Sequence, residues 1–179
     1  MQYIKGIENY QNENKTAITL GKFDGLHRGH ELLVERVIEH QKNDDVDSVV
    51  FAFDMPTDIR LLTSEEKAAK LEGRVDYFID CPFTKEISNI SAKEFIEKIL
   101  VDTFHVKYIV VGTDFGFGYK REGNVHMLRK FAKQYDYEVE ALEKIQYKGR
   151  EISSTYVKEE LKKGNMDIVK ELLGYSYEK

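Results

Sequence analysis

The chain has 179 residues, of which 41% are hydrophobic and 33% charged, and its formal net charge is −5 at pH 7. This length and composition are typical of one globular domain, and the acidic balance argues against broad electrostatic binding of nucleic acid. A single cysteine excludes a disulfide framework, and no apolar run is long enough to span a membrane, so we expect one domain over residues 1–179 in a reducing, cytoplasmic setting with no membrane partner.

Strand-like and helix-like patterns alternate along the chain. The predicted strands cover residues 16–23, 48–53, 75–80, 107–112 and 137–142, and the predicted helices cover residues 31–40, 64–73, 95–104, 124–135, 155–164 and 165–173. Thr63 with Glu66, and Ser91 with Glu94, have the spacing of capping boxes at helix starts. The alternation predicts an α/β fold with a mostly parallel sheet flanked by helices, whose ligands bind beyond the carboxyl ends of the strands.

The stretch GKFDGLHRGH, residues 21–30, stands where the first predicted strand gives way to a helix. Its glycines allow tight turns and the close approach of a bulky group to the first helical turn. Free N–H groups and the positive end of a helix dipole favour phosphate there, and His27 and His30 would donate hydrogen bonds to it. We expect Lys22 and Arg28 to add positive charge nearby.

Two other interpretations of the histidine pair stay open from the residues alone. Histidines at this spacing bind zinc in some proteins, although no further cysteine or histidine cluster completes a zinc site here. They are otherwise ordinary loop residues beside glycines that turn the chain. The position between a buried strand and a helix favours phosphate, although the stretch is neither a Walker A loop nor a GxGxxG motif.

The stretch VVGTDFGFGYKREGN, residues 110–124, leaves the most apolar predicted strand and enters a glycine-rich loop. Its aromatic residues, among them Phe115 and Phe117, are suited to hold a flat ligand, and Lys120 and Arg121 are suited to contact phosphate. The alternative is a mobile surface loop whose aromatic side chains pack on the core.

The stretch EISSTYVKEEL, residues 151–161, places three hydroxyl residues before an amphipathic helix. One hydroxyl would be enough to cap that helix. Three in a row also fit a phosphate cradle, with Lys158 one turn inside the helix. On spacing alone, capping and phosphate binding are equally favoured.

These segments together resemble a known family. HRGH at residues 27–30 resembles the HxGH signature of the nucleotidylyltransferase superfamily, and the longer GKFDGLHRGH closely resembles the GxFDGxHxGH form of the FMN adenylyltransferase module of bacterial FAD synthetases. VVGTDFGFGYKREGN resembles the VVGxDFxFGxxRxGD segment of that family, ISSTYVK its ISSTxIR motif, and residues 81–100 its PFTxExAxLSAxEF segment. The resemblance covers residues 16–177 and stops where the bifunctional enzymes continue into a riboflavin kinase domain, so we expect no kinase domain here.

The resemblance implies a Rossmann-like nucleotidylyltransferase fold and the transfer of AMP from ATP to FMN, giving FAD and pyrophosphate. It also implies Mg²⁺ bridging the phosphates, with its ligands unspecified. The residues it implies are His27, His30 and Lys158 for catalysis; Gly21, Phe23, Asp24, Gly29, Ser153, Ser154 and Thr155 for ATP; and Phe83, Thr84, Asp114, Phe117, Gly118 and Arg121 for the flavin.

The sequence departs from the family pattern at several positions. Gly116 stands where an arginine is common and Asn124 where an aspartate is common, Lys158 replaces the last arginine of ISSTxIR, and Met55-Pro56-Thr57 replaces Pro-His-Pro. Lysine keeps the charge of arginine but loses its bidentate fork. Two alternatives therefore remain: a nucleotidylyltransferase for another phosphorylated acceptor, and a non-catalytic relative that binds flavin or nucleotide.

Overall fold

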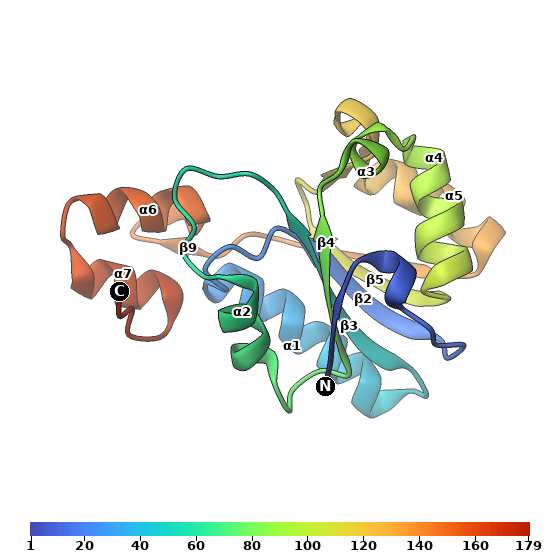
Figure 1. Ribbon diagram of the computed structural model, residues 1–179, viewed down its shortest axis with the longest axis horizontal. Coiled ribbons are helices and arrows are strands. Elements are labelled where there is room, and N and C mark those ends of the chain that lie inside the picture. Colours follow the sequence, from blue (N-terminus) through green and yellow to red (C-terminus); the bar gives the residue numbers. More distant parts are fainter.

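The computed structural model describes all residues, 1–179. Six parallel strands form one sheet in the order β1-β4-β3-β2-β5-β8, with helices on both faces (Figure 1), which confirms the expected Rossmann-like α/β fold. The elements are β1 (Gln2–Lys5), η1 (Ile7–Asn9), β2 (Thr16–Gly21), α1 (Arg28–Asn43), β3 (Asp47–Asp54), α2 (Ser64–Leu71), β4 (Tyr77–Pro82), α3 (Lys85–Asn89), α4 (Ala92–Glu94), η2 (Phe95–Thr103), β5 (Val106–Gly112), β6 (Gly116–Phe117), η3 (Tyr119–Arg121), β7 (Gly123–Asn124), α5 (Val125–Tyr135), β8 (Glu138–Leu142), β9 (Gln146–Tyr147), β10 (Arg150–Glu151), α6 (Ser154–Lys162) and α7 (Met166–Leu173). No helix combines the length and the apolar character needed to cross a bilayer.

Local sequence signals account for most of the element boundaries. Strand β2 ends at Gly21, two residues before its predicted end, because Phe23 has a φ of 52° that an extended strand does not allow. The capping box at Thr63 forms in full. At Ser91 only one half forms, in which the Ser91 hydroxyl accepts the N–H of Glu94, and the helix continues through a stretch of π-helix from residue 95 to 103.

The sheet is buried on both faces, as its long apolar strands require. Phe51 points into the larger core, where its ring packs edge-to-face against Phe95 and Phe104 beneath η2. Phe78 lies in the second core, which α1 and α2 cover. Because all four rings are fully or almost fully buried, the two faces fix the positions of the strand ends at which the site forms.

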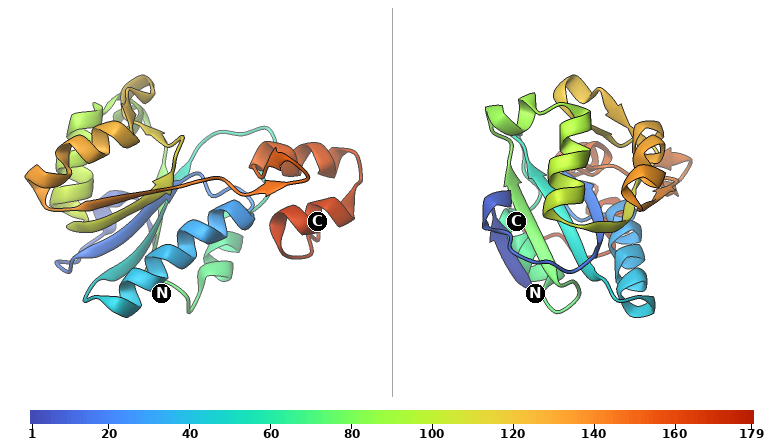
Figure 2. Two further views of the ribbon diagram at one scale, coloured as in Figure 1. Left: turned by 180° about the vertical axis from the view of Figure 1, so that it is seen from behind. Right: turned by 90° about the vertical axis from the view of Figure 1, so that its right-hand side faces the viewer.

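Helices α6 and α7 form a small unit beyond the carboxyl ends of the strands, with a core of their own (Figures 1 and 2). Leu61, from the loop between β3 and α2, is part of that core. The Tyr175 hydroxyl donates to the Gly25 carbonyl at 2.7 Å and the Tyr177 hydroxyl to the Leu61 carbonyl at 3.0 Å. These contacts hold the segment after α7 against the loops that follow β2 and β3.

Candidate active site

The sheet order changes direction beside β2. The chain passes from β2 to β3 and β4 on one side and then crosses to β5 and β8 on the other. The loops that leave β2 and β5 therefore diverge, and in open parallel sheets ligands bind in the crevice between such loops. Three adjoining cavities lie at this edge, and Lys22 lines all three.

His27 caps the N-terminus of α1. Its Nδ1 accepts the backbone N–H of His30 at 3.3 Å, so the neutral ring carries its proton on Nε2. That nitrogen makes no hydrogen bond within the chain. A side chain at Gly29 would come within 3.1 Å of the His27 ring, so glycine lets this ring lie against the first helical turn. The N-terminus of α1 thus presents the neutral Nε2–H of His27 beside backbone N–H groups that have no partner within the helix.

The His30 ring stacks on the His27 ring, with centroids 3.6 Å apart and planes 15° apart, and it rests on the buried ring of Phe23. Its Nδ1 is buried and has no hydrogen-bond partner. Burial lowers the pKa of His27 to about 4, and burial together with neighbouring positive charge holds the pKa of His30 well below its usual value. Both rings are therefore neutral at pH 7, and a buried nitrogen without a partner points to a ligand.

The two rings line a cavity of about 420 Å³, which we call the histidine cavity. One part of its wall is apolar, with Leu32, Leu33 and Ile152, and the other part is polar. Lys144 stands at the polar side, paired with Asp114 at 2.7 Å. The cavity offers apolar surface for a flat group and N–H donors for an anion.

The start of α6 closes the polar side of this cavity. Ser153 caps the helix by accepting the N–H of Tyr156, and the Ser154 hydroxyl donates to the Asp24 carbonyl at 2.7 Å. Lys158, one turn further on, forms a 2.7 Å ion pair with the Asp24 carboxylate, which also accepts the N–H of Leu61. Asp24 therefore ties together the loops after β2 and β3 and the start of α6.

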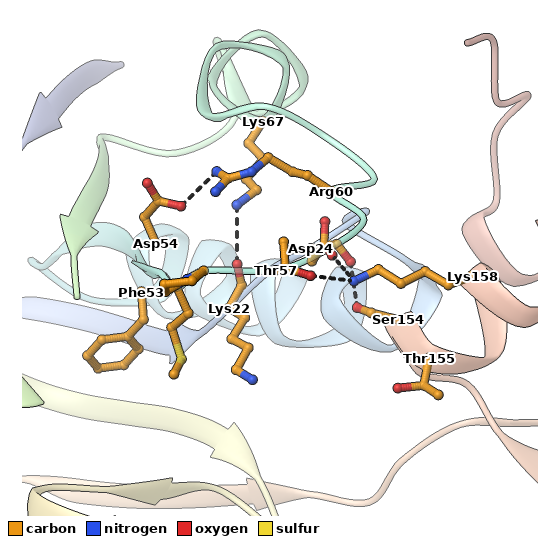
Figure 3. A pocket seen from close by; sticks show the side chains of 12 residues that line it. Lys22, Asp24, Phe53, Asp54, Thr57, Arg60, Lys67, Ser154, Thr155 and Lys158 are labelled. Carbon is orange, nitrogen blue, oxygen red and sulfur yellow. Dashed lines mark hydrogen bonds and ion pairs between the residues drawn. The ribbon is translucent and has the colours of Figure 1, made fainter.

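A smaller cavity of about 160 Å³, the cation cavity, adjoins this point (Figure 3). Its wall carries four cations and two carboxylates. These side chains are Lys22, Arg60, Lys67, Lys158, Asp24 and Asp54. It shares Lys22, Ser154 and Thr155 with the histidine cavity, so one extended anion would contact both.

A third cavity of about 400 Å³, the aromatic cavity, lies on the other side of Lys22. Its wall contains a run of phenylalanine rings with neighbouring centroids 5.5 to 6.3 Å apart. The rings belong to Phe53, Phe83, Phe95, Phe115 and Phe117. Lys22, Asp114 and Arg121 supply the charged side chains of this wall. Such a cavity fits a large flat ring system with a polar edge.

Comparison with known proteins identifies the family. Residues 9–156 match the family model described as FAD synthetase. The chain belongs to the FAD synthetase family.

Curated relatives match nearly the whole chain, beyond the residues 9–156 that match the family model. The chain is 31% identical over 186 residues to a bifunctional riboflavin kinase/FMN adenylyltransferase of Buchnera aphidicola subsp. Schizaphis graminum, a match over 97% of this chain and 60% of that protein. It is 30% identical over 190 residues to the protein of that name from Escherichia coli K12, over 99% of this chain and 60% of that one. The chain therefore spans about 60% of the length of these curated relatives.

A crystal structure described as a macrolide-efflux protein from Streptococcus pneumoniae superposes on 97% of this chain and 60% of its own, with a TM-score of 0.84 and 24% identity. At that identity the likeness shows the fold alone.

Most residues assigned from the resemblance to FAD synthetases lie around the three cavities. The cavities are lined by Gly21, Asp24, His27, Gly29, His30, Phe83, Asp114, Phe117, Gly118, Arg121, Ser153, Ser154, Thr155 and Lys158. Two others lie outside the cavity walls. Phe23 is fully buried beneath His30, and Thr84 caps α3 by accepting the N–H of Ile87. The expectation that Arg28 adds charge to the site is wrong, because its guanidinium donates to the Glu171 carbonyl on α7.

Sequence reasoning missed several residues of the cavity walls. Lys67, Arg60 and Lys144 add cations, and Phe53 and Phe95 add rings. Of these, only Lys67 carried a readable signal, because a lysine on the inner face of a short amphipathic helix breaks its apolar pattern. Phe95 lies within residues 81–100, which resemble the family, but its position there indicated no contact with a ligand, and Arg60, Lys144 and Phe53 lie outside the quoted motifs.

Two departures from the family pattern have a local explanation. A side chain at Gly116 would come within 2.8 Å of the Arg121 guanidinium, which donates to the Asp114 carbonyl. Arg121 therefore covers the place beside Gly116. Asn124 caps α5 by accepting the N–H of Met127 at 3.0 Å, a bond that aspartate would make equally well.

Proposed function

We propose that this chain transfers the AMP group of ATP to the phosphate of FMN, giving FAD and pyrophosphate, and that residues 1–179 act as one FMN adenylyltransferase domain. The observation that carries the proposal is the pair of neutral, stacked imidazoles at the start of α1. They lie where a nucleotide-sized cavity meets an aromatic one. Membership of the FAD synthetase family supports the same assignment.

The reaction needs no nucleophilic side chain. A phosphate oxygen of FMN attacks the α-phosphorus of ATP in line, and the bond from that phosphorus to the β-bridging oxygen breaks with its electron pair on pyrophosphate. His27 and His30 donate N–H bonds to the α-phosphate as charge gathers on it, and Lys22 lies between the two substrate cavities. Ser154, Thr155 and Lys158 contact the remaining phosphates. Catalysis then rests on positioning and charge stabilisation.

The substrates fit the two larger cavities. The isoalloxazine ring of FMN stacks among the phenylalanine rings of the aromatic cavity, and Arg121 and Asp114 contact its polar edge. The adenine of ATP lies against the apolar wall of the histidine cavity, beside Leu32 and Ile152. Both phosphate tails then meet near Lys22.

A magnesium ion fits this arrangement as a companion of the substrate. No three carboxylate, histidine or cysteine side chains gather into a cage for a metal, and Mg²⁺ commonly takes one or two carboxylates together with substrate phosphates and water. Asp24 and Asp54 both line the cation cavity and would supply these carboxylates in exchange for their ion pairs with Lys158 and Arg60. When bound, the ion would neutralise charge on the phosphates.

The test is an assay of the purified protein with ATP, MgCl₂ and FMN, in which FAD is separated by chromatography. We expect FAD to form, and we expect His30→Ala to lower its rate about ten- to a hundredfold through the loss of one hydrogen bond to a charged group. His126→Ala, an exposed histidine on α5, is the matched control. Unchanged FAD formation by a folded His30→Ala protein would remove the imidazole from the mechanism.

The same assay separates the alternatives. A panel that replaces ATP by CTP, and FMN by other phosphorylated acceptors, identifies a nucleotidylyltransferase of different substrate. Tight binding of ATP or FMN without release of pyrophosphate identifies a non-catalytic relative.

A further inference from the structure

Lys67 occupies a place in α2 where an apolar residue is expected. The inner face of this helix consists of Ser64, Lys67, Ala68 and Leu71, all of them buried. Lys67 is only 3% exposed. Lysine is almost never so deeply buried unless its charge has a partner, so this position needs an explanation.

The Lys67 ammonium is incompletely bonded. Its only hydrogen bond within the chain goes to the Lys22 carbonyl at 3.3 Å, whereas an ammonium has three N–H donors. The group forms part of the wall of the cation cavity (Figure 3). Burial lowers the pKa of Lys67, and the charges of Asp24 and Asp80 act in the opposite direction without either carboxylate forming an ion pair with it.

The carboxylates of the cation cavity are committed to other cations. Asp24 pairs with Lys158 and Asp54 pairs with Arg60, each at 2.7 Å. Of the four cations in the wall, Lys22 and Lys67 are left without a carboxylate partner. The cavity thus has an excess of positive charge in a small, partly enclosed volume, which favours a compact polyanion.

We propose that Lys67 binds the terminal phosphates of the nucleotide, and that the cation cavity holds the pyrophosphate that leaves them. The histidine cavity and the cation cavity share Ser154 and Thr155, so a triphosphate whose α-phosphate lies at the imidazoles extends toward Lys67. When the bond at the α-phosphorus breaks, the leaving pyrophosphate takes the electron pair, and the Lys67 ammonium lies beside that new charge. This inference rests on the function proposed above.

The competing explanation is that Lys67 is structural, through its bond to the Lys22 carbonyl. Lys67→Met separates the two, because methionine keeps the length of the apolar stem and removes the ammonium. Exchanging a poorly paired buried charge for an apolar group is neutral or stabilising when the charge serves only a ligand. We therefore expect the melting temperature of Lys67→Met to equal or exceed that of the wild type.

The decisive measurement is the binding of inorganic pyrophosphate, followed by isothermal titration calorimetry. Loss of one hydrogen bond to a charged group corresponds to about a tenfold to hundredfold weaker Kd for Lys67→Met. The control is Lys70→Met, which removes a cation from the same helix outside the three cavities, where its ammonium lies over the Tyr175 ring. Pyrophosphate binding by Lys67→Met within twofold of the wild type overturns the inference, and so does a wild type that binds no pyrophosphate.

The test can still be made if Lys67→Met does not fold. If Lys67→Met is unstable, Lys67→Gln keeps an N–H donor for the Lys22 carbonyl. A stable Lys67→Gln with weak pyrophosphate binding supports the inference, and one with wild-type binding overturns it. The calorimetry measures binding without catalysis, so the two proposals can fail separately. If the protein binds pyrophosphate through Lys67 but forms no FAD, only the proposed function is refuted. If the protein forms FAD but Lys67→Met binds pyrophosphate as the wild type does, only this inference is refuted.

Discussion

The two nitrogens of His27 do different work, and replacement by asparagine separates them. Nδ1 caps α1, and Nε2 is free for a ligand. Asparagine is a good N-cap, whereas alanine caps poorly. We expect His27→Ala to be about 1 kcal/mol less stable at pH 7.5 than His27→Asn, the usual contribution of a cap. Both variants should lose FAD formation to the same extent, because both lack the Nε2 donor.

The same substitution changes how stability depends on pH. The pKa of His27 is lowered from 6.5 to about 4 in the folded protein by burial. Between those values the unfolded chain binds more protons than the folded one, so the free energy of unfolding falls as pH falls. From pH 7.5 to pH 5 this residue alone accounts for a fall of about 2 kcal/mol. Neither His27→Asn nor His27→Ala should show that part of the fall.

Urea unfolding at pH 7.5 and pH 5, followed by circular dichroism, measures both effects. His30 contributes a pH dependence of the same sign in all three proteins, so the difference between wild type and variant reports His27 together with its effect on the stacked ring of His30. If His27→Asn loses as much stability at pH 5 as the wild type does, then His27 is not held neutral by burial. If His27→Ala is as stable as His27→Asn, the cap is not formed.

Three further outcomes follow from the structure. Gly118→Ala should destabilise the fold by about 2 kcal/mol or more in urea unfolding, because φ is +76° and the new Cβ would lie 2.6 Å from the Ala92 backbone nitrogen. Asp24→Asn should lower stability by about 1–2 kcal/mol through loss of its partly buried ion pair with Lys158, and should tighten metal-free pyrophosphate binding severalfold in calorimetry by removing negative charge from the cation cavity. Burial raises the pKa of the Cys81 thiol to about 12, so iodoacetamide at pH 8 should label it only after unfolding, as seen by mass spectrometry.

The central part of the fold could be predicted because its signals are local. Apolar strands such as residues 107–112 and hydroxyl caps such as Thr63 act through neighbours in sequence. Strand β1 could not be predicted in this way, because it has four residues, lies at the edge of the sheet and pairs only with β4. The π-helix from residue 95 to 103 likewise has the same apolar spacing as an α-helix over so few turns.

The residues of the site likewise fall into those that local sequence signals could predict and those that they could not. His27 and Ser154 belong to motifs at strand-to-helix junctions, and any parallel sheet brings such junctions to one edge. Lys67 and Phe53 reach the site through tertiary packing. The sequence shows that Phe53 is buried and that Lys67 interrupts an apolar helix face, but not which cavity either one lines. Arg28 shows the reverse error, since its place within the motif suggested a role but its side chain turns toward the end of α7.

Buried polar atoms without a partner also occur away from the cavities, at Thr19 Oγ1 and Asp80 Oδ1, but three incompletely bonded groups gather at one place. The Nδ1 of His30 has no partner, Nε2 of His27 makes no bond within the chain, and Lys67 uses one of its three donors. The buried Nδ1 of His30 and the buried charge of Lys67 raise the free energy of the ligand-free protein, because a buried polar atom or charge without a full set of partners costs more than a made bond returns. All three groups border two connected cavities whose walls also contain the unpaired Lys22. A single polyphosphate would satisfy all three groups at once, whereas apolar ligands, zinc or mere packing would leave at least the ammonium unsatisfied.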